Sequence, residues 1–329
     1  MTMANWLGFL GIPIARQRNK NTSRFPDSTA GEGAKQKKAM LKRSLRKSIT
    51  FVLISCSACL LGVYLAMFPP LAKDLWNFVF FPPTKGSIDL SQQLKVMTKT
   101  LHCRFTDVFF AAPDGARLHA YYFSLAKPKR TILLSHGNGG TLQHRLGYAY
   151  ILLRTGCSVF MYDYEGYGES SGSPDLPKVC QDGTAAFDYV TQQLHIKPQD
   201  VVLFGESIGT GVSCEISQRR QAGGIILLSP FTSLLAAARN LVPLVNVFPS
   251  WSFPTPQLEN VEILKKSHPP LLILHGKKDP TLPYRFAEEL MAKASPPKAL
   301  VMLPHSGHNA NEDLGLAEES IRKFIDGLP

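Results

Sequence analysis

The sequence predicts an α/β fold, in which a mostly parallel sheet of about eight strands carries helices on both faces. From about Arg104 onward, short β-branched, aliphatic or aromatic runs alternate with longer helical segments, a pattern typical of parallel sheets with crossover helices. The first two runs differ. Residues 105–112 and 116–123 flank the turn Pro113-Asp114-Gly115, so we expect them to form an antiparallel hairpin.

Six further strands and a small cap complete the predicted domain, which covers residues 104–329. The expected strands are 131–136, 158–164, 201–205, 224–229, 271–276 and 299–303. The cap segment, about 230–268, is rich in Phe, Pro and Leu. It is interpreted either as a lid or acyl-chain groove or as one surface helix with a packed loop. The first interpretation is favoured, because apolar residues in loops near strand tips often line pockets.

The positive charge of the chain is concentrated in its N-terminal tail. The protein has 36 Lys and Arg against 25 Asp and Glu, a net charge of +11. Residues 1–48 contain 11 Lys or Arg and two acids, a net charge of +9, so residues 49–329 carry only +2. A nucleic-acid footprint would lie along a folded face, so no nucleic-acid partner is expected. The tail, 1–48, is expected to be disordered.

Residues 49–68 form an apolar run of the length needed to cross a bilayer as a helix. Seven Lys or Arg precede it within residues 35–47, and few follow it closely. We therefore expect a single-pass membrane anchor with a cytoplasmic N-terminus and an extracytoplasmic or lumenal domain. A cleaved signal peptide is the alternative, although the tail and the run are long for one. Residues 69–103 are expected to be a linker, whose aromatic residues Trp76, Phe78, Phe80 and Phe81 form an interfacial collar or pack on the domain.

The motif Gly205-Glu206-Ser207-Ile208-Gly209 stands between an expected strand and an expected helix. This GxSxG context is typical of the nucleophile elbow of the α/β-hydrolase fold, where a sharp turn exposes the serine. Gly205 and Gly209 are expected to let the crowded backbone close around it.

An acid and a base follow later strands in the order that this fold requires. Asp279 follows the strand 271–276 and His308 follows 299–303, so both should reach the sheet edge where Ser207 emerges. His305 and Asp163 are weaker rivals for the roles of base and acid. The predicted catalytic triad is Ser207, His308 and Asp279.

Two backbone amides are expected to form an oxyanion hole. Ile208 follows the nucleophile, and Asn138 lies in the glycine-rich loop after the third strand, where Gly137 and Gly139 allow the chain to turn. A turn without catalytic duty is the alternative for this loop, and His136 is expected to be structural. No ligand cluster or phosphate loop suggests a metal or organic cofactor.

With these motifs identified, residues 105–325 resemble the membrane-anchored α/β-hydrolase-domain serine hydrolases, a group that includes protein depalmitoylases. The resemblance rests on motifs in family order: HGNGG at 136–140, YDYEGYGESSG at 162–172, FGESIGTG at 204–211, SPFTS at 229–233, HGKKD at 275–279 and SGHN at 306–309. Glu165 replaces an arginine usual in the family, and Ala310 stands where an acid is frequent.

The resulting hypothesis is a serine hydrolase that cleaves acyl esters or thioesters near a membrane through an acyl-enzyme. A serine peptidase acting on small peptides and a catalytically inactive membrane scaffold are the alternatives. The pairing of Cys103, Cys157, Cys180 and Cys214 and the oligomeric state stay open.

Overall fold

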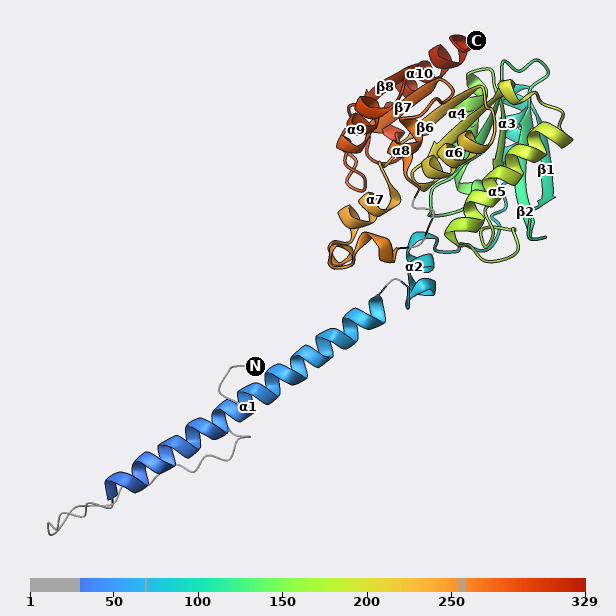
Figure 1. Cartoon of the computed structure of the whole chain (residues 1–329). Coiled ribbons are helices and arrows are strands. Elements are labelled where there is room, and N and C mark those ends of the chain that lie inside the picture. Colours follow the sequence, from blue (N-terminus) through green and yellow to red (C-terminus); the bar gives the residue numbers. More distant parts are fainter. Residues whose placement is uncertain (1–29, 69, 254, 256–257) are drawn as a thin grey trace. The chain divides into compact units, whose positions relative to one another are not determined.

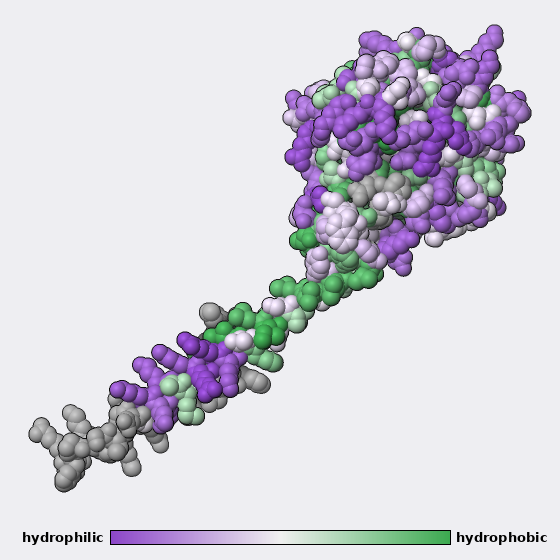
Figure 2. Space-filling model, in the orientation of Figure 1, coloured by the Kyte–Doolittle hydropathy of each residue, from purple (hydrophilic) through white to green (hydrophobic). Residues whose placement is uncertain are grey.

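A computed structural model describes residues 30–68, 70–253, 255 and 258–329. The chain divides into two compact units, Met1–Val63 and Tyr64–Pro329. Helix α1 (Ala30–Met67) contains the segment Lys35–Met67, which is long and apolar enough to cross a membrane. Figure 2 shows its apolar part in green and the preceding basic part in purple. Residues 30–48, expected to belong to a disordered tail, are helical here; the prediction for residues 1–29 lies outside the described part.

The second unit is built on one eight-stranded sheet, as predicted. Its strands are β1 (Arg104–Ala111), β2 (Arg117–Ser124), β3 (Thr131–Ser135), β4 (Ser158–Tyr162), β5 (Val201–Glu206), β6 (Gly224–Leu228), β7 (Leu271–Gly276) and β8 (Lys298–Leu303). They lie in the order β1-β2-β4-β3-β5-β6-β7-β8. β2 pairs antiparallel with β1 and β4, and the remaining neighbours are parallel. The predicted fold class is confirmed.

Helices cover both faces of the sheet. Successive side chains of each strand point to opposite faces, and because the central strands are mostly apolar, both faces need to be covered. The neighbours Ile132 and Leu133 of β3 are both fully buried but belong to two different apolar clusters. One cluster includes residues of α5 (Leu176–Asp188), α6 (Ile208–Arg219) and α9 (Arg285–Lys293); the other includes residues of α3 (Ser91–Leu101), α4 (Leu146–Arg154) and α10 (Leu314–Asp326). Figure 1 shows this layered arrangement. The carboxyl ends of the parallel strands are left for loops.

The segment expected as a linker contains two helices, α2 (Lys73–Phe80) and α3. Trp76, Phe80 and Phe81 are buried in the larger apolar cluster, whereas Phe78 is 62% exposed. Three of the four aromatic residues therefore pack on the domain.

The cap segment between β6 and β7 is mostly helical. It contains α7 (Leu234–Leu241), two 3₁₀ turns (Pro243–Val247 and Ser250–Ser252) and α8 (Asn260–Leu264). Ser233 caps α7, its hydroxyl accepting a hydrogen bond from the Ala236 N–H at 3.1 Å. The four cysteines of the domain, Cys103, Cys157, Cys180 and Cys214, are buried free thiols.

Candidate active site

Ser207 occupies a strained turn between β5 and α6. Its φ is 53° and its ψ is −118°, a conformation that a non-glycine residue adopts only when its surroundings impose it. The Ser207 N–H donates to the Leu228 carbonyl at 3.0 Å. This bond ties the turn to the end of β6.

Glycine is the only residue that fits on either side of this turn. A Cβ on Gly209 would lie 2.0 Å from the Ser135 carbonyl oxygen, and one on Gly205 would lie 2.4 Å from the Gly209 carbonyl oxygen. Both contacts are to backbone atoms, which cannot rotate away. The close approach carries the end of β3 directly against the start of α6.

Asp279 and His308 form a hydrogen-bonded pair. His308 Nδ1 lies 2.7 Å from Asp279 Oδ2, and the backbone N–H groups of Thr281 and Leu282 donate to Asp279 Oδ1 at 2.8 and 2.9 Å. The Asp279 side chain is fully buried, and His275 Nε2 lies 3.4 Å from it. Burial raises the pKa of Asp279, but the hydrogen bonds from His275 and His308 outweigh it and hold the pKa well below its usual range.

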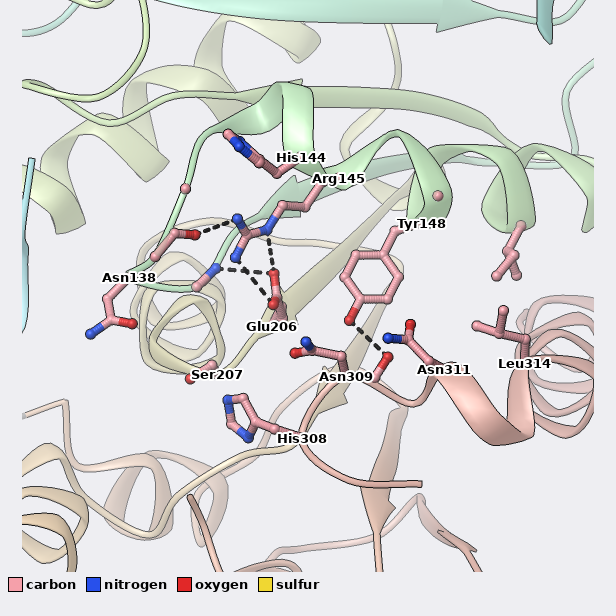
Figure 3. A pocket seen from close by; sticks show the side chains of 15 residues that line it. Asn138, His144, Arg145, Tyr148, Glu206, Ser207, His308, Asn309, Asn311 and Leu314 are labelled. Atoms are coloured by element: carbon pink, nitrogen blue, oxygen red, sulfur yellow. Dashed lines mark hydrogen bonds and ion pairs between the residues drawn. The ribbon is translucent and has the colours of Figure 1, made fainter. Parts of the chain in front are cut away.

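Ser207 and His308 face the same space. Figure 3 shows the serine hydroxyl and the imidazole ring projecting from different loops toward one cavity. Within the described residues Ser207 Oγ has no hydrogen-bond partner, and in unliganded enzymes such contacts often tighten only when substrate binds. His305, the rival base, is exposed, and its backbone N–H donates to Asp313.

The two expected oxyanion residues lie beside a second cavity, which Ser207 and His308 also line. Asn138 and Ile208 both line this cavity, and among the described residues neither backbone N–H has a hydrogen-bond partner. The Asn138 carbonyl oxygen accepts a 3.0 Å hydrogen bond from the Tyr167 hydroxyl, which helps to hold this loop in place. Ile208 opens α6, where unsatisfied N–H groups and the helix dipole favour negative charge.

A buried ion pair behind the serine is the part of the site that sequence reasoning missed. Arg145 Nε lies 2.8 Å from Glu206 Oε2, which also accepts the Gly137 N–H at 3.2 Å. Arg145 Nη1 donates to the Gly139 carbonyl. Burial raises the pKa of Glu206, but Arg145 outweighs this and lowers it. The pair fastens the loop on both sides of Asn138.

The glycines of the glycine-rich loop differ in how much space surrounds them. Gly140 has a φ of 73°, and a Cβ there would lie 2.8 Å from Arg145 Nη1. A Cβ on Gly137 would lie 3.2 Å from Arg145 Nη2, and one on Gly139 would meet nothing within 4 Å. Gly140, rather than the predicted Gly137 and Gly139, is the position in this loop where the positive φ requires glycine.

The other residues weighed from sequence are structural. His136 is fully buried, with Nδ1 2.6 Å from the Gly137 carbonyl oxygen and Nε2 3.3 Å from Asp163. Asp163 Oδ1 accepts the Leu142 N–H at 2.7 Å. Glu165, which replaces the family arginine, is buried against Lys178 at 2.7 Å and lines neither cavity described below.

Comparison with known proteins agrees with this architecture. Residues 126–268 match the family described as serine aminopeptidase S33, and residues 249–326 match the family described as TAP-like protein. An uncharacterized protein of Mycobacterium tuberculosis is 31% identical over 67% of this chain and 78% of its own length. Human alpha/beta hydrolase domain-containing protein 17B is 32% identical over 60% of this chain and 66% of its own length.

Solved structures show the same fold. An esterase of Pyrococcus furiosus superposes with a TM-score of 0.59 at 16% identity, over 70% of this chain and 94% of its own. An alpha-beta hydrolase of Vibrio vulnificus gives a TM-score of 0.58 at 20% identity, over 72% and 87%.

The chain belongs to the α/β-hydrolase family. It is therefore a hydrolase, and the family relationship bears out the coarser part of the resemblance drawn from its motifs.

In this α/β-hydrolase, two cavities meet at Asn138, Ser207 and His308. The larger, of about 600 Å³, has a mixed polar and apolar wall and is lined by Gly137, Asn138, Gly139, Gly140, His144, Arg145, Gly147, Tyr148, Ile151, Glu206, Ser207, His308, Asn309, Asn311 and Leu314. The smaller, of about 330 Å³, is mostly apolar and is lined by Trp76, Val79, Phe80, Asn138, Ser207, Ile208, Phe231, Leu234, Ala237, Ala238, Leu241, Val242, Thr281, Leu282 and His308. In the described part of the chain, no three His, Cys, Asp or Glu side chains are grouped to hold a metal ion.

Proposed function

We propose that the protein hydrolyses carboxylic esters or thioesters through a Ser207–His308–Asp279 triad. The observation that carries the proposal is the 2.7 Å bond between His308 and Asp279, on the border of the cavity that the strained Ser207 enters. An unactivated serine is a poor nucleophile, and a histidine held by a carboxylate supplies the missing base.

The chemistry proceeds in two steps. His308 Nε2 accepts the Ser207 Oγ proton as the oxygen attacks the substrate carbonyl, and the Asn138 and Ile208 N–H groups stabilise the resulting oxyanion. His308 then returns the proton to the leaving alcohol or thiol, which gives an acyl-enzyme. Water, activated by the same imidazole, releases the acid. Asp279, ionised throughout, holds the Nδ1–H tautomer.

The smaller cavity supports an acyl substrate. Its walls come from α2 and α7, and its apolar side chains would exclude water around a hydrocarbon chain. The larger cavity would receive the polar leaving group. Ala237 and Ala238 are small and buried in the α7 wall of this cavity. Ala238→Trp is therefore expected to fill the cavity. It should lower kcat/KM for octanoyl esters by at least about tenfold and leave kcat/KM for acetyl esters unchanged.

A peptidase acting on free amino termini finds less support. Such an enzyme needs an unpaired carboxylate for the substrate ammonium, but among the described residues that line the two cavities Glu206 is the only acid. It is already paired with Arg145. Parallel assays with esters, thioesters and aminoacyl amides separate the alternatives, and a preference for amides contradicts the ester proposal.

We propose further that α1 anchors the enzyme in a membrane, with the basic N-terminal side in the cytoplasm and the hydrolase unit on the other side. The proposal rests on the segment Lys35–Met67, which is long and apolar enough to cross a membrane, and on the excess of Lys and Arg that precedes its apolar run, residues 49–68. Protease treatment of sealed vesicles is the test. In sealed vesicles whose cytoplasmic side faces outward, the hydrolase unit is expected to be protected from protease. Digestion of this unit in the absence of detergent would instead place it on the cytoplasmic side.

Fluorophosphonate labelling tests the nucleophile. Labelling is expected in the wild type and in Ser217→Ala, a half-buried serine of α6 whose hydroxyl bonds to its own helix, and is expected to vanish in Ser207→Ala. His308→Ala and the neighbouring His305→Ala form a second matched pair, of which only the first should abolish turnover. A folded wild-type protein that takes no label favours the inactive scaffold instead.

A further inference from the structure

Exposed apolar side chains are concentrated in two segments that also supply walls of the smaller cavity. We call it the rim: Leu71, Leu75, Phe78 and Val79 from the segment before and within α2, and Leu241, Val242, Leu244, Val247 and Trp251 from the cap. Leu71 is 71% exposed, Phe78 62% and Trp251 75%. Exposed apolar side chains concentrated beside a cavity are typical of an interaction site.

The two segments that carry the rim contact each other through aromatic residues. The Phe68 ring lies 5.8 Å from the Trp251 ring, and Trp76 lies 6.3 Å from Phe248. Figure 1 shows α2 and α7 at the same end of the hydrolase unit. The rim thus lies on two segments that are far apart in sequence and in contact in the fold.

The smaller cavity opens within the rim. Val79, Leu241 and Val242 line the cavity and are also 41%, 50% and 37% exposed. A molecule that enters between these side chains from outside reaches Ser207 without crossing a charged surface. The cap half of the rim, residues 241–251, contains no charged residue, and residues 71–79 contain only Lys73 and Asp74.

The position of the rim along the chain indicates what covers it. α1 ends at Met67 and Leu71 follows four residues later, so the first rim residue lies within about 14 Å of the helix end at about 3.6 Å per residue. If α1 crosses a bilayer, as the proposed function assumes, the start of the rim cannot leave the interface. Trp is enriched at this depth of a membrane, and Trp251 is an exposed rim residue.

We propose that the rim docks on the lipid leaflet from which α1 emerges, and that acyl chains pass from this leaflet directly into the smaller cavity. The interface thereby extends from one helix to the surface of the hydrolase unit. The substrate class is an acyl chain carried by a lipid or by a lipid-modified molecule, with the scissile carbonyl near the interface.

Fluorescence quenching tests the contact with lipid. The full chain is reconstituted in phosphatidylcholine vesicles containing lipids brominated near the glycerol end of the chains. The chain has a third tryptophan, Trp6, so both proteins carry Trp6→Phe. In this background the quenched intensity is expected to fall clearly on Trp251→Phe, because Trp76, the other remaining tryptophan, is buried in the protein. Equal quenching in both proteins refutes the docking.

Activity tests the route. The double variant Phe78→Glu, Trp251→Glu is expected to lose at least about tenfold in kcat/KM on a long-chain ester embedded in vesicles, since it replaces two large apolar side chains with charges that oppose burial in lipid. Its activity on a short soluble ester should be unchanged, because neither residue lines a cavity. Val96→Glu, at an exposed apolar position of α3, is the matched control and should keep both activities. Parallel losses on both esters overturn the proposal.

Carbonate extraction separates this proposal from the membrane anchor. Wild-type protein released from membranes by carbonate refutes the anchor itself. Retained protein without quenching of Trp251 refutes only the docking, and a Trp251 that is shielded in a dimer of this chain assigns the rim to a second copy instead.

Discussion

Gly209→Ala tests how closely the elbow and the oxyanion loop must approach. The added Cβ would stand 2.0 Å from the Ser135 carbonyl oxygen, 2.6 Å from its carbon and 2.8 Å from the His136 carbonyl oxygen, where ordinary contact begins at 3.4 Å. The end of β3 and the start of α6 must then separate by about 1.4 Å, the difference between 3.4 and 2.0 Å, and such overpacking costs about 1–3 kcal/mol of folding free energy. Because Asn138 follows His136 closely, the separation also moves the proposed oxyanion donor Asn138 away from Ser207. A misplacement of about 1 Å lowers turnover about 100-fold.

Ester turnover and urea unfolding of the same preparations measure both effects. Gly315→Ala is the matched control, because Gly315 is also the second residue of a helix, α10, and a Cβ there meets nothing within 4 Å. It should keep full kcat and lose no stability. A Gly209→Ala protein with wild-type kcat and wild-type unfolding free energy would refute the reasoning that only glycine fits.

Three further predictions concern buried carboxylates. Asp279→Asn should lower kcat about 10⁴-fold, because the amide no longer fixes the His308 tautomer. The control is Asp200→Asn, which changes an ion pair with Arg130 that lines neither cavity and should keep the wild-type kcat. Equal kcat values for the two variants in steady-state assays would contradict the triad. Glu206→Gln should cost about 3–5 kcal/mol in urea unfolding, because it leaves the Arg145 charge buried and unpaired; a loss below about 1 kcal/mol would show that the pair contributes little. Burial raises the pKa of Asp182 to about 8, so between about pH 4 and 8 the folded state holds a proton that the unfolded chain has released, and this group lowers the free energy of unfolding by about 1.4 kcal/mol per pH unit. Unfolding of wild type and Asp182→Asn from pH 5 to 9 should therefore diverge in favour of the variant as the pH rises, and parallel curves would refute the shift.

The sheet and the elbow were predictable because their signals are local. β3, β5, β6 and β7 are short runs of buried residues, and each was found within a residue or two of its bounds. Ser207 needed only its two glycines and its place between a strand and a helix. The Asp279–His308 contact was anticipated from order and topology, since parallel strands deliver their loops to one edge.

The Arg145–Glu206 pair was not predictable in the same way. Glu206 stands at a variable position of GxSxG, and Arg145 lies 61 residues earlier in a 3₁₀ turn. Neither position carries a periodic or motif signal of its own. A charged residue that follows four apolar strand residues was the available hint, because a charge next to a buried strand needs a partner.

α2 was likewise hidden by its position. Its eight residues follow an apolar span and a proline-containing turn, so composition suggests a linker. Tertiary packing of Trp76 and Phe80 decides the outcome, and packing of this kind has no local signature.

The departure of Glu165 from the family pattern illustrates how a motif position can change without touching the site. Glu165 is buried beside Asp182, to which it donates its backbone N–H at 2.9 Å, and its carboxylate lies 2.7 Å from Lys178. Lys178 also lies 2.9 Å from Asp114 in the hairpin turn. An acid at position 165 therefore needs this lysine for its charge, and its own charge contributes, after burial, to the raised pKa of Asp182. Glu165 is thus coupled to the pH dependence of stability, while Ser207 and the two cavities are built from other residues.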